Sequence, residues 1–427
     1  MIYDVIVIGG GPAGMMAAGT AGAKGRRVLL LEKNPSLGKK LLITGGGRCN
    51  VTNNPSTPLR TGKTEVRSML SKYKGNDQFL FSAFSQFSVK DTLEFFHSRG
   101  MQTKEENEGR IFPVSNDAKS VFDVLVNYMK EGKVEIKTKA EVLEILVDED
   151  KNIIVKTRGG DYFAKTCIVA TGGISRPETG STGEGFKWLK NLGHTIIEND
   201  FALVPVALSD AWAKKLGGVT LKNIKLTTFS GYARSGEARQ NWQKESEGKG
   251  DIMFTHFGIT GPLALNMSRE IGELLKYGKV AVEIDLFPSK DLGVLRKEFQ
   301  ELLASEPNKK IKNTLSNMVT GALCDALLKL AQIDGDTKNN MVSAEARKAI
   351  TQLMKKVPLN VSHLLGEDKA VVSSGGVVLP EVNFKTMQSR IIPNLYLVGD
   401  VLNIDRPSGG YSLQLCWTTG FVAGSNC

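Results

Sequence analysis

The chain has 427 residues, of which 41% are hydrophobic and 23% are charged, and its formal net charge is +10. This composition is typical of a globular protein with two or more domains, and it excludes a collagen-like, low-complexity or disordered chain. The lysines and arginines are spread along the chain without a long basic block, so a basic solvated surface explains the charge better than a nucleic-acid-binding or membrane-binding function.

Cysteine and histidine spacing predicts neither a disulfide framework nor a metal site. The five cysteines form no C-x-x-C pair and the four histidines are isolated, which predicts free thiols in a reducing cytoplasm. The uncharged stretch 5–23 follows Asp4 and is interrupted by glycines and a proline. We therefore expect a buried strand and a close-packed helix there, and no membrane span.

The opening segment, "YDVIVIGGGPAG", predicts a buried strand over residues 3–8 and a glycine turn with the spacing Gly9-x-Gly11-x-x-Gly14. A helix and a second apolar strand follow, and that strand ends at Glu32. Gly9 permits the turn, Gly11 lets the backbone approach a pyrophosphate, and Gly14 lets the helix pack against the strand. Glu32 is placed to accept hydrogen bonds from ribose hydroxyls, so the unit predicts a dinucleotide site, which NAD and FAD fit equally.

The stretch "LLITGGGRCNVTN", residues 41–53, contains three consecutive glycines. We expect an extended loop that crosses the cofactor, with bare backbone at Gly46 and its neighbours lying against a flat ring. Arg48 would then bring a positive charge to an anionic reduced flavin. The alternatives are an ordinary surface ion pair for Arg48 and a small buried apolar residue for Cys49.

Later segments point to the same cofactor. A helix is predicted over residues 118–130, and a hairpin leads into a buried strand that closes at 170–173. Another buried strand, 395–398, is followed by Asp400, whose carboxylate suits ribityl hydroxyls. A helix beginning near Gly410 would direct its N-terminus at the flavin ring. The glycine-rich loop 173–185 is expected to cap the FAD site or form a hinge, with a phosphate site as the alternative.

Several of these blocks carry a family resemblance. "GGGPAG", "GKKLLITGGGRCNVTN", "VATGGISRPETGSTGEGF", "FTHFGITGPLAL" and "VGDVLNIDRPSGGYSLQ" resemble the bacterial HI-type or YhiN-like flavoproteins, which are grouped with bile-acid 3-oxo-Δ4,6 reductases and aminoacetone oxidases. The resemblance covers essentially the whole chain. It implies one tightly held FAD and an α/β fold: a split Rossmann-like FAD domain (1–191 and 368–427) with an inserted domain (192–367).

The resemblance has departures in the last strand block. Asp400 stands where the family pattern has a glutamate, and Asn403 and the loop Arg406-Pro407-Ser408 also differ. These departures leave the substrate open. The chain ends at Cys427 inside the last predicted helix, so we expect that helix to be short or truncated. The residues expected to contact FAD are Gly9, Gly11, Pro12, Ala13, Gly14, Glu32, Lys33, Lys40, Gly46, Arg48, Cys49, Asn50, Val142, Ala170, Thr171, Gly172, Gly399, Asp400, Gly410, Tyr411 and Ser412.

The inserted domain begins with β-rich segments and continues with helical periodicity over about 291–356, which predicts a β-barrel carrying a helical subdomain. His256 and Tyr411 are the candidate proton donors, and Arg48 is the third candidate catalytic residue. Histidine is the side chain that exchanges a proton most readily near neutral pH. A purely structural role is the alternative for His256 and for Tyr411.

The leading functional hypothesis is a FAD-dependent oxidoreductase, in which NAD(P)H reduces the flavin and flavin N5 passes a hydride to a small enone-like acceptor. One alternative is an amine oxidase of the aminoacetone type that produces hydrogen peroxide. Another is an RNA-binding or RNA-modifying flavoprotein, which the basic balance supports weakly. The last alternative is a flavoprotein that binds FAD and has only a binding role. The oligomeric state is left open.

Overall fold

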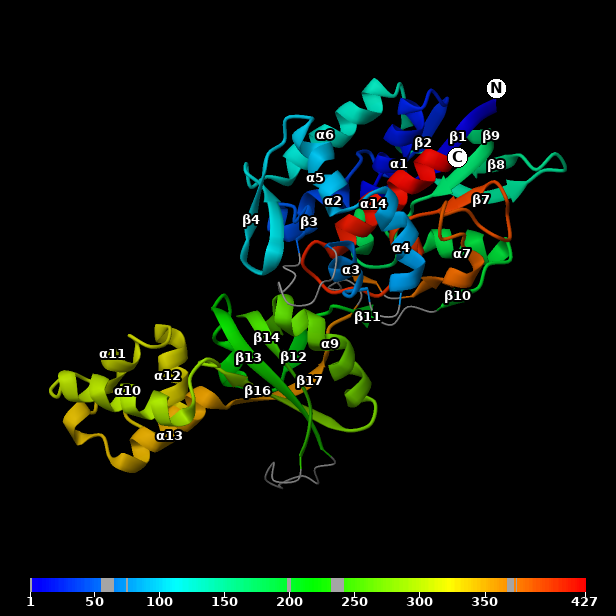
Figure 1. Ribbon diagram of the computed structural model, residues 1–427. Helices are drawn as coiled ribbons and strands as arrows, with labels where there is room; N and C mark the ends of the chain where they lie inside the picture. Colours follow the sequence, from blue (N-terminus) through cyan, green and yellow to red (C-terminus); the bar gives the residue numbers. More distant parts are fainter. Residues whose placement is uncertain are drawn as a thin grey trace. The chain divides into compact units, whose positions relative to one another are not determined.

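The computed structural model describes residues 2–54, 65–73, 76–197, 201–231, 242–366, 372–373 and 375–427. The chain divides into two compact units, residues 1–201 with 370–427 and residues 202–369 (Figure 1). Each unit has a hydrophobic core of its own. The first unit is therefore built from the two ends of the chain, with the second unit inserted between them.

The core of the first unit is a seven-stranded sheet with the order β6-β2-β1-β9-β8-β7, in which β20 also pairs with β9. The strands β6, β2, β1, β9 and β20 are parallel, whereas β8 and β7 are antiparallel. Their bounds are β1 Ile2–Ile8, β2 Val28–Leu31, β6 Glu135–Lys137, β7 Val142–Val147, β8 Ile153–Thr157, β9 Gly160–Val169 and β20 Leu395–Leu397. The central strands read as continuous apolar runs because helices cover both faces of a parallel sheet. The predicted opening strand is confirmed.

Two helices, α1 (Pro12–Ala23) and α14 (Tyr411–Asn426), pack with their backbones close together. A Cβ added at Gly420 would lie 2.6 Å from the Ala13 carbonyl oxygen, and one at Gly424 would lie 2.4 Å from that of Ala17. Only glycine permits this approach. It joins the first helix of the chain to the last, so residues of both chain ends meet beside the sheet.

The other helices of this unit surround the sheet and a small three-stranded sheet of order β3-β5-β4. The helix α6 confirms the predicted helix over 118–130, and α7 follows the glycine-rich loop. The bounds are α2 Lys39–Ile43, α3 Glu65–Leu70, α4 Asp77–Gln86, α5 Val89–His97, α6 Ala118–Glu131, α7 Glu184–Asn191, β3 Thr52–Asn53, β4 Thr103–Glu106 and β5 Arg110–Pro113.

A buried histidine fixes the end of α7 to the C-terminal segment. His194 is 3% exposed, and its Nδ1 lies 2.9 Å from Glu381 Oε2 while its Nε2 lies 3.0 Å from Ser389 Oγ. Thr195 also donates its backbone N–H to Glu381. Burial acts to raise the pKa of Glu381, but the hydrogen bonds from Thr195 and His194 outweigh it, so that pKa lies below its ordinary value. These hydrogen bonds join the end of α7 to the C-terminal segment in the interior of the first unit.

The second unit contains a closed barrel of order β12-β15-β14-β13-β16-β17. The helix α9 (Pro262–Leu275) packs on it, and a helical subdomain is inserted between β16 and β17 (Figure 1). The expected barrel with a helical subdomain is confirmed. The bounds are β12 Val206–Leu208, β13 Thr220–Gly231, β14 Gln243–Phe254, β15 Gly258–Thr260, β16 Lys279–Asp285, β17 Val357–Leu364, α10 Leu292–Ser305, α11 Ile311–Leu315, α12 Gly321–Leu330 and α13 Ala344–Lys355.

One ammonium group fastens the helical subdomain to the barrel. Lys355 Nζ, at the end of α13, lies 2.6 Å from Asp285 Oδ2 and donates to the carbonyl oxygens of Phe287 at 2.8 Å and Lys290 at 2.7 Å. The Lys355 and Asp285 side chains are 17% and 9% exposed. Asp285 is the last residue of β16, and Phe287 and Lys290 follow it in the chain. The Lys355 ammonium therefore joins the last residue of the helical subdomain to the segment where that subdomain begins.

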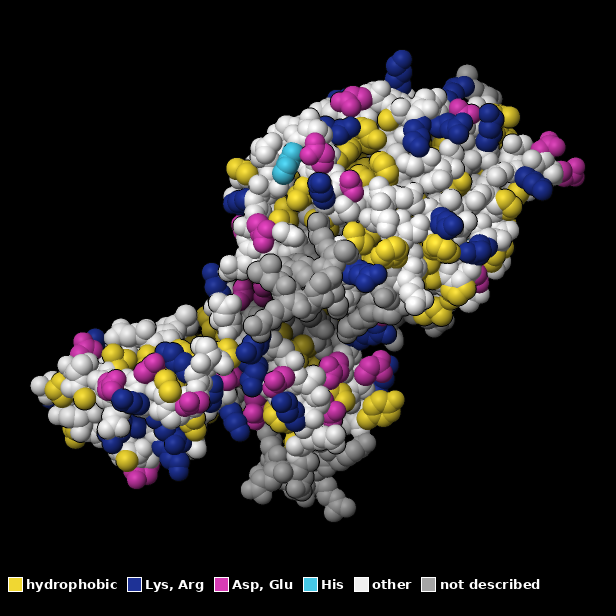
Figure 2. Space-filling view, viewed as in Figure 1, with side chains coloured by type: hydrophobic (Ala, Val, Ile, Leu, Met, Phe, Trp, Pro, Cys, Tyr) yellow, Lys and Arg dark blue, Asp and Glu magenta, His cyan; other side chains and the backbone are white. Residues whose placement is uncertain are grey.

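The charges on the surface are mixed in sign. Figure 2 shows Lys and Arg side chains interspersed with Asp and Glu side chains on the face drawn. Ion pairs such as Lys119–Asp123 and Lys312–Asp336 reflect this mixing. Among the helices in the described part of the chain, none combines the length and the apolarity needed to cross a bilayer.

Candidate functional site

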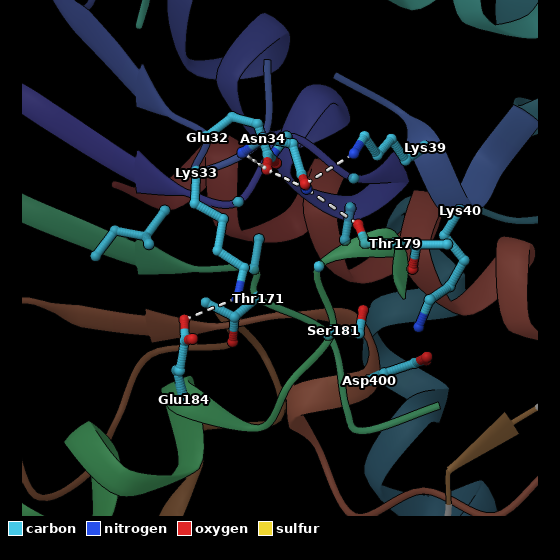
Figure 3. Close-up of a pocket in the computed structure, with 18 of the residues that line it drawn as sticks. Glu32, Lys33, Asn34, Lys39, Lys40, Thr171, Thr179, Ser181, Glu184 and Asp400 are labelled. Carbon is cyan, nitrogen blue, oxygen red and sulfur yellow. Dashed lines mark hydrogen bonds and ion pairs between the residues drawn. The ribbon is translucent and has the colours of Figure 1, made fainter. Parts of the chain in front are cut away.

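A cleft of about 920 Å³, open to solvent, lies at the carboxyl ends of the parallel strands in the first unit (Figure 3). Ile8 of β1, Leu31 of β2, Ala170 after β9 and Val398 after β20 line it. The strands β1 and β9 are neighbours, and the chain connects β1 to β2 on one side and β9 to β20 on the other, so the two connections run in opposite directions from this point. Ligands of open α/β sheets bind at such switch points.

Many residues predicted from the sequence to contact a cofactor come together in this cleft. They come from widely separated stretches of the chain, from the glycine turn to the residues after β20. They are Gly9, Gly11, Pro12, Ala13, Glu32, Lys33, Lys40, Val142, Ala170, Thr171, Gly172 and Asp400.

The three glycines of the opening turn have different neighbours. Gly9 has φ +107°, and a Cβ there would lie 2.5 Å from the Ala170 carbonyl oxygen, while a Cβ on Gly14 would lie 1.9 Å from the Gly9 oxygen. A Cβ on Gly11 meets no atom within 4 Å. Gly11 is also the N-cap of α1, whose first turn has no side-chain cap and no acidic residue. The start of α1 thus presents backbone N–H groups that no side chain caps, and this arrangement suits a pyrophosphate.

Glu32 lies at one end of the cleft and is 8% exposed. Its Oε2 accepts a hydrogen bond from the Gly10 N–H at 2.8 Å, and its Oε1 accepts two at 2.8 Å from the backbone and side chain of Asn34. Lys33 Nζ binds Thr182 Oγ1 at 2.7 Å and Glu184 Oε2 at 2.9 Å. The last contacts hold the glycine-rich loop over this end of the cleft, as Figure 3 shows.

The other end of the cleft carries the charged side chains of Lys40 and Asp400, which extend toward one another in Figure 3. Lys40 Nζ donates to Ser175 Oγ at 3.2 Å. Burial lowers the pKa of Lys40, whereas the Asp400 carboxylate acts in the opposite direction. Cys416 also lines this end, and burial raises the pKa of its thiol to about 12, so it stays protonated at neutral pH.

Several buried polar side-chain atoms have no hydrogen-bond partner within the described residues, and two of them belong to residues predicted to contact the cofactor. One is Thr171 Oγ1, whose residue lines the cleft, and the other is Asn50 Oδ1. A Cβ added at Gly410 would lie 3.0 Å from Asn50 Oδ1. Buried polar atoms are nearly always paired, so Thr171 Oγ1, whose residue lines the cleft, fits a bound ligand that supplies a hydrogen bond. Together with the start of α1, the residues present fit a dinucleotide cofactor such as FAD.

The triple-glycine segment has a different local structure from the one expected. Residues 39–43 form the short helix α2 and residues 44–47 form a 3₁₀ turn, so the expected extended loop is wrong for this part of the segment. The physical reason is backbone conformation. Gly38 starts the helix in the left-handed region, and Gly45, Gly46 and Gly47 have φ of 57°, 68° and 86°, which curl the chain. Left-handed φ is what favours glycine at these positions.

Arg48 and Cys49, which follow the glycines, do not line the cleft. The Arg48 guanidinium forms an ion pair with Glu106, donates to Asn116 Oδ1 at 3.2 Å and lies 4.1 Å from the Phe112 ring centroid. Cys49 is fully buried, and burial raises the pKa of its thiol to about 12. The roles predicted for both residues at a flavin stay predictions.

The two candidate proton donors also lie outside the residues that line the cleft. Tyr411 is the first residue of α14, donates its hydroxyl to Asn53 Oδ1 at 3.1 Å, and has a pKa raised to about 12 by burial. His256 is exposed on the turn between β14 and β15, where its ring lies 5.0 Å from that of Phe257. The remaining predicted contacts outside the lining are Gly14, Gly46, Asn50, Gly399, Gly410 and Ser412.

The cleft also contains residues that the sequence did not reveal. Asn34 pairs with Glu32, while Ser181, Thr182 and Glu184 come from the glycine-rich loop. Arg406 pairs with Asp400. The acidic strand end could have pointed to Asn34, since an amide two residues after a buried carboxylate is a natural partner for it.

Comparison with known proteins identifies the family of the chain. The family model of the HI0933-like protein Rossmann domain matches residues 3–426. The chain belongs to this family. This is a family of FAD-dependent oxidoreductases, and the resemblance predicted from the sequence is confirmed.

Two curated relatives span nearly the whole chain. A 3-dehydro-bile acid delta(4,6)-reductase from Clostridium scindens is 32% identical over 98% of this chain and 97% of its own length. A ribosomal RNA dihydrouridine synthase from Escherichia coli is 29% identical over 98% of this chain and 96% of its own length. The fold is similar to that of a 3-ketosteroid delta1-dehydrogenase from Sterolibacterium denitrificans, with a TM-score of 0.55, 13% identity, and coverage of 99% and 98% of the two chains.

Proposed function

We propose that the protein is an NAD(P)H-dependent flavin reductase of a carbon–carbon double bond conjugated to a carbonyl group. The single observation that carries this proposal is the shared chemistry of two full-length relatives of different substrate class. A delta(4,6)-reductase reduces an alkene conjugated to a ketone, and a dihydrouridine synthase reduces the ring alkene of uracil, which is conjugated to a carbonyl. The reaction type is common to both, although the substrates are not.

The reaction balances with one hydride, which carries two electrons and a hydrogen nucleus, and one separate proton. Bound FAD supplies hydride chemistry at its N5 position, with NAD(P)H as the source of the two electrons. The hydride goes to the β-carbon of the acceptor and a proton goes to the α-carbon. For the proton we retain the sequence-based proposal that His256 or Tyr411 delivers it.

The residues of the cleft have distinct tasks under this proposal. The backbone N–H groups at the start of α1, beside Gly11, bind the pyrophosphate. Glu32, held by Gly10 and Asn34, orients the adenosine end, and Asp400 accepts hydrogen bonds from hydroxyls at the other end. Lys40 adds a positive charge inside the cleft.

The test is an anaerobic half-reaction assay with the purified, FAD-loaded protein. The flavin absorbance should bleach on addition of NADH or NADPH, and should return when a 3-oxo-Δ4 steroid is then added. Bleaching by aminoacetone with hydrogen peroxide formed in air, and none by NAD(P)H, would establish the amine oxidase alternative. A flavin that no donor bleaches would leave only a binding role.

A second candidate, an RNA dihydrouridine synthase, is favoured by the Escherichia coli relative and by a Haemophilus influenzae relative of the same name, 25% identical over 98% of this chain. The net charge of +10 is compatible with it. Reoxidation of the reduced flavin by unmodified ribosomal RNA, with dihydrouridine found by mass spectrometry, would favour RNA. Binding should then weaken steeply as salt rises.

The proton-donor proposal is tested separately. His256→Ala should leave the FAD spectrum and the NAD(P)H half-reaction unchanged, since the histidine is exposed and lies in the second unit, while slowing the acceptor half-reaction. Lys249→Ala, on β14 of the same barrel, is the control. Equal acceptor rates in wild type and His256→Ala would show that the histidine is structural.

A further inference from the structure

A buried arginine stands behind the carboxylate at the inner end of the cleft. The Arg406 side chain is 1% exposed, whereas that of Asp400 is 15% exposed and lines the cleft. The Arg406 Nη2 donates to Asp400 Oδ1, Nη1 donates to the Ile404 carbonyl at 2.7 Å, and Nε donates to Ser412 Oγ at 3.0 Å. One guanidinium therefore ties Asp400 to the first turn of α14.

This arrangement leaves one oxygen of Asp400 for a ligand. Within the described residues, the carboxylate forms its hydrogen bonds through Oδ1 alone. A carboxylate accepts several hydrogen bonds, so Oδ2 is available to hydroxyl groups in the cleft. The guanidinium is planar and always charged, so it fixes the orientation of the carboxylate and sets a permanent positive charge against it.

The backbone around Asp400 adds to this fixed position. Gly399 has φ +65°, and a Cβ there would lie 3.1 Å from the Ala13 Cβ and 3.4 Å from Cys416 Sγ. The Gly399 N–H donates to Thr419 Oγ1 of α14 at 3.0 Å. The carboxylate is thus held from two sides, by its backbone against α1 and α14 and by its side chain against Arg406.

One carboxylate and two cations act at this end of the cleft. Asp400, Arg406 and Lys40 all act on the Cys416 thiol, Asp400 raising its pKa and the two cations lowering it. They are therefore within electrostatic range of one wall of the cleft. In a partly buried site, a charge left without its partner acts strongly on its surroundings.

We propose that Arg406 is a positioning residue of the FAD site, which orients Asp400 toward hydroxyls of the cofactor and balances its charge so that the pair together tunes cofactor affinity and reduction potential. The inference rests on the proposed function only in that the cleft holds FAD.

The test uses Arg406→Met, Asp400→Asn and the double variant, with Lys119→Met as a control that removes an exposed cation of the same unit. Flavin reduction adds negative charge. Arg406→Met leaves an unbalanced carboxylate and should shift the potential to more negative values, and Asp400→Asn leaves an unbalanced guanidinium and should shift it to more positive values. The double variant should return close to wild type, and Lys119→Met should not move it.

FAD affinity supplies a second readout. Loss of one oriented, charge-assisted contact should raise the FAD dissociation constant about tenfold in either single variant. The effect of Arg406→Met should disappear in the Asp400→Asn background, because the arginine acts through the aspartate. A purely structural arginine would give the same loss in both backgrounds and no opposite potential shifts.

Shifts of the same sign in the two single variants, or an unchanged potential in Asp400→Asn, would overturn the inference. Should Arg406→Met alone fail to fold, Asp400→Asn and the double variant still decide it through the raised and restored potentials. The steroid and NAD(P)H assays address the proposed reaction independently. If the protein is inactive in those assays but the two single variants still shift the reduction potential in opposite directions, the proposed reaction is refuted and the role of Arg406 is not.

Discussion

Gly11 and Gly14 lie three residues apart in one turn, and the structure predicts opposite consequences for the same substitution. In Gly14→Ala the new Cβ would lie 1.9 Å from the Gly9 carbonyl oxygen and 3.2 Å from the Ala170 Cβ. Because a backbone oxygen cannot rotate away, α1 must move. Overpacking costs about 3 kcal/mol and the gain in helix propensity returns about 1 kcal/mol, which leaves about 2 kcal/mol of lost stability.

In Gly11→Ala the new Cβ meets no atom within 4 Å, and the backbone at φ −81° and ψ −176° accepts alanine without strain. The free energy of unfolding of the apoprotein should stay within about 0.5 kcal/mol of wild type. The methyl group projects into the cleft, where it should crowd the pyrophosphate. A crowding cost of about 2 kcal/mol raises the FAD dissociation constant about 30-fold.

Urea unfolding of the two apoproteins and titration of each with FAD measure the two quantities separately. Gly11→Ala should lose affinity and keep stability, and Gly14→Ala should lose stability. Wild-type FAD affinity in Gly11→Ala would mean that the pyrophosphate does not lie at the start of α1. Wild-type stability in Gly14→Ala would refute the packing derived for the helix.

Three further predictions concern groups outside the cleft. Arg48→Ala should leave the flavin reduction potential unchanged. It should cost at most about 1 kcal/mol of stability, because the ion pair of Arg48 with Glu106 is partly exposed. A lowered potential in spectroelectrochemistry would instead support the position beside the flavin that the sequence predicts for Arg48. Lys355→Met should destabilise the second unit by about 3 kcal/mol in thermal unfolding, since it leaves the buried Asp285 carboxylate without its partner. The control Lys356→Met should leave the stability unchanged. Equal effects of the two substitutions would contradict the stabilising role of the Lys355 contacts. The folded-state pKa of Glu381 is lowered, so the stability it adds is present above its unfolded pKa and is lost as pH falls through the folded value. Glu381→Gln should therefore lower Tm at neutral pH and flatten its fall with acid, and an acid limb as steep as that of wild type would contradict this.

The family resemblance implied the fold class, and the residues by themselves determined the opening strand, turn and helix and the acidic end of the second strand. These follow from local physics: an apolar run, a glycine spacing and a strand end are each readable within about ten residues. The barrel with its helical insertion was also readable, because its strands and helices have clear periods of their own.

Only the tertiary structure decided which of these pieces share a wall of the cleft. The carboxyl ends of β1, β2, β9 and β20 meet because the sheet order interleaves the two ends of the chain, and no local pattern encodes that order. The curl of Gly45, Gly46 and Gly47 and the Glu106 partner of Arg48 likewise depend on contacts distant in sequence. Arg406 was visible in the sequence as a departure, but its role as the partner of Asp400 depends on a loop folding back on α14.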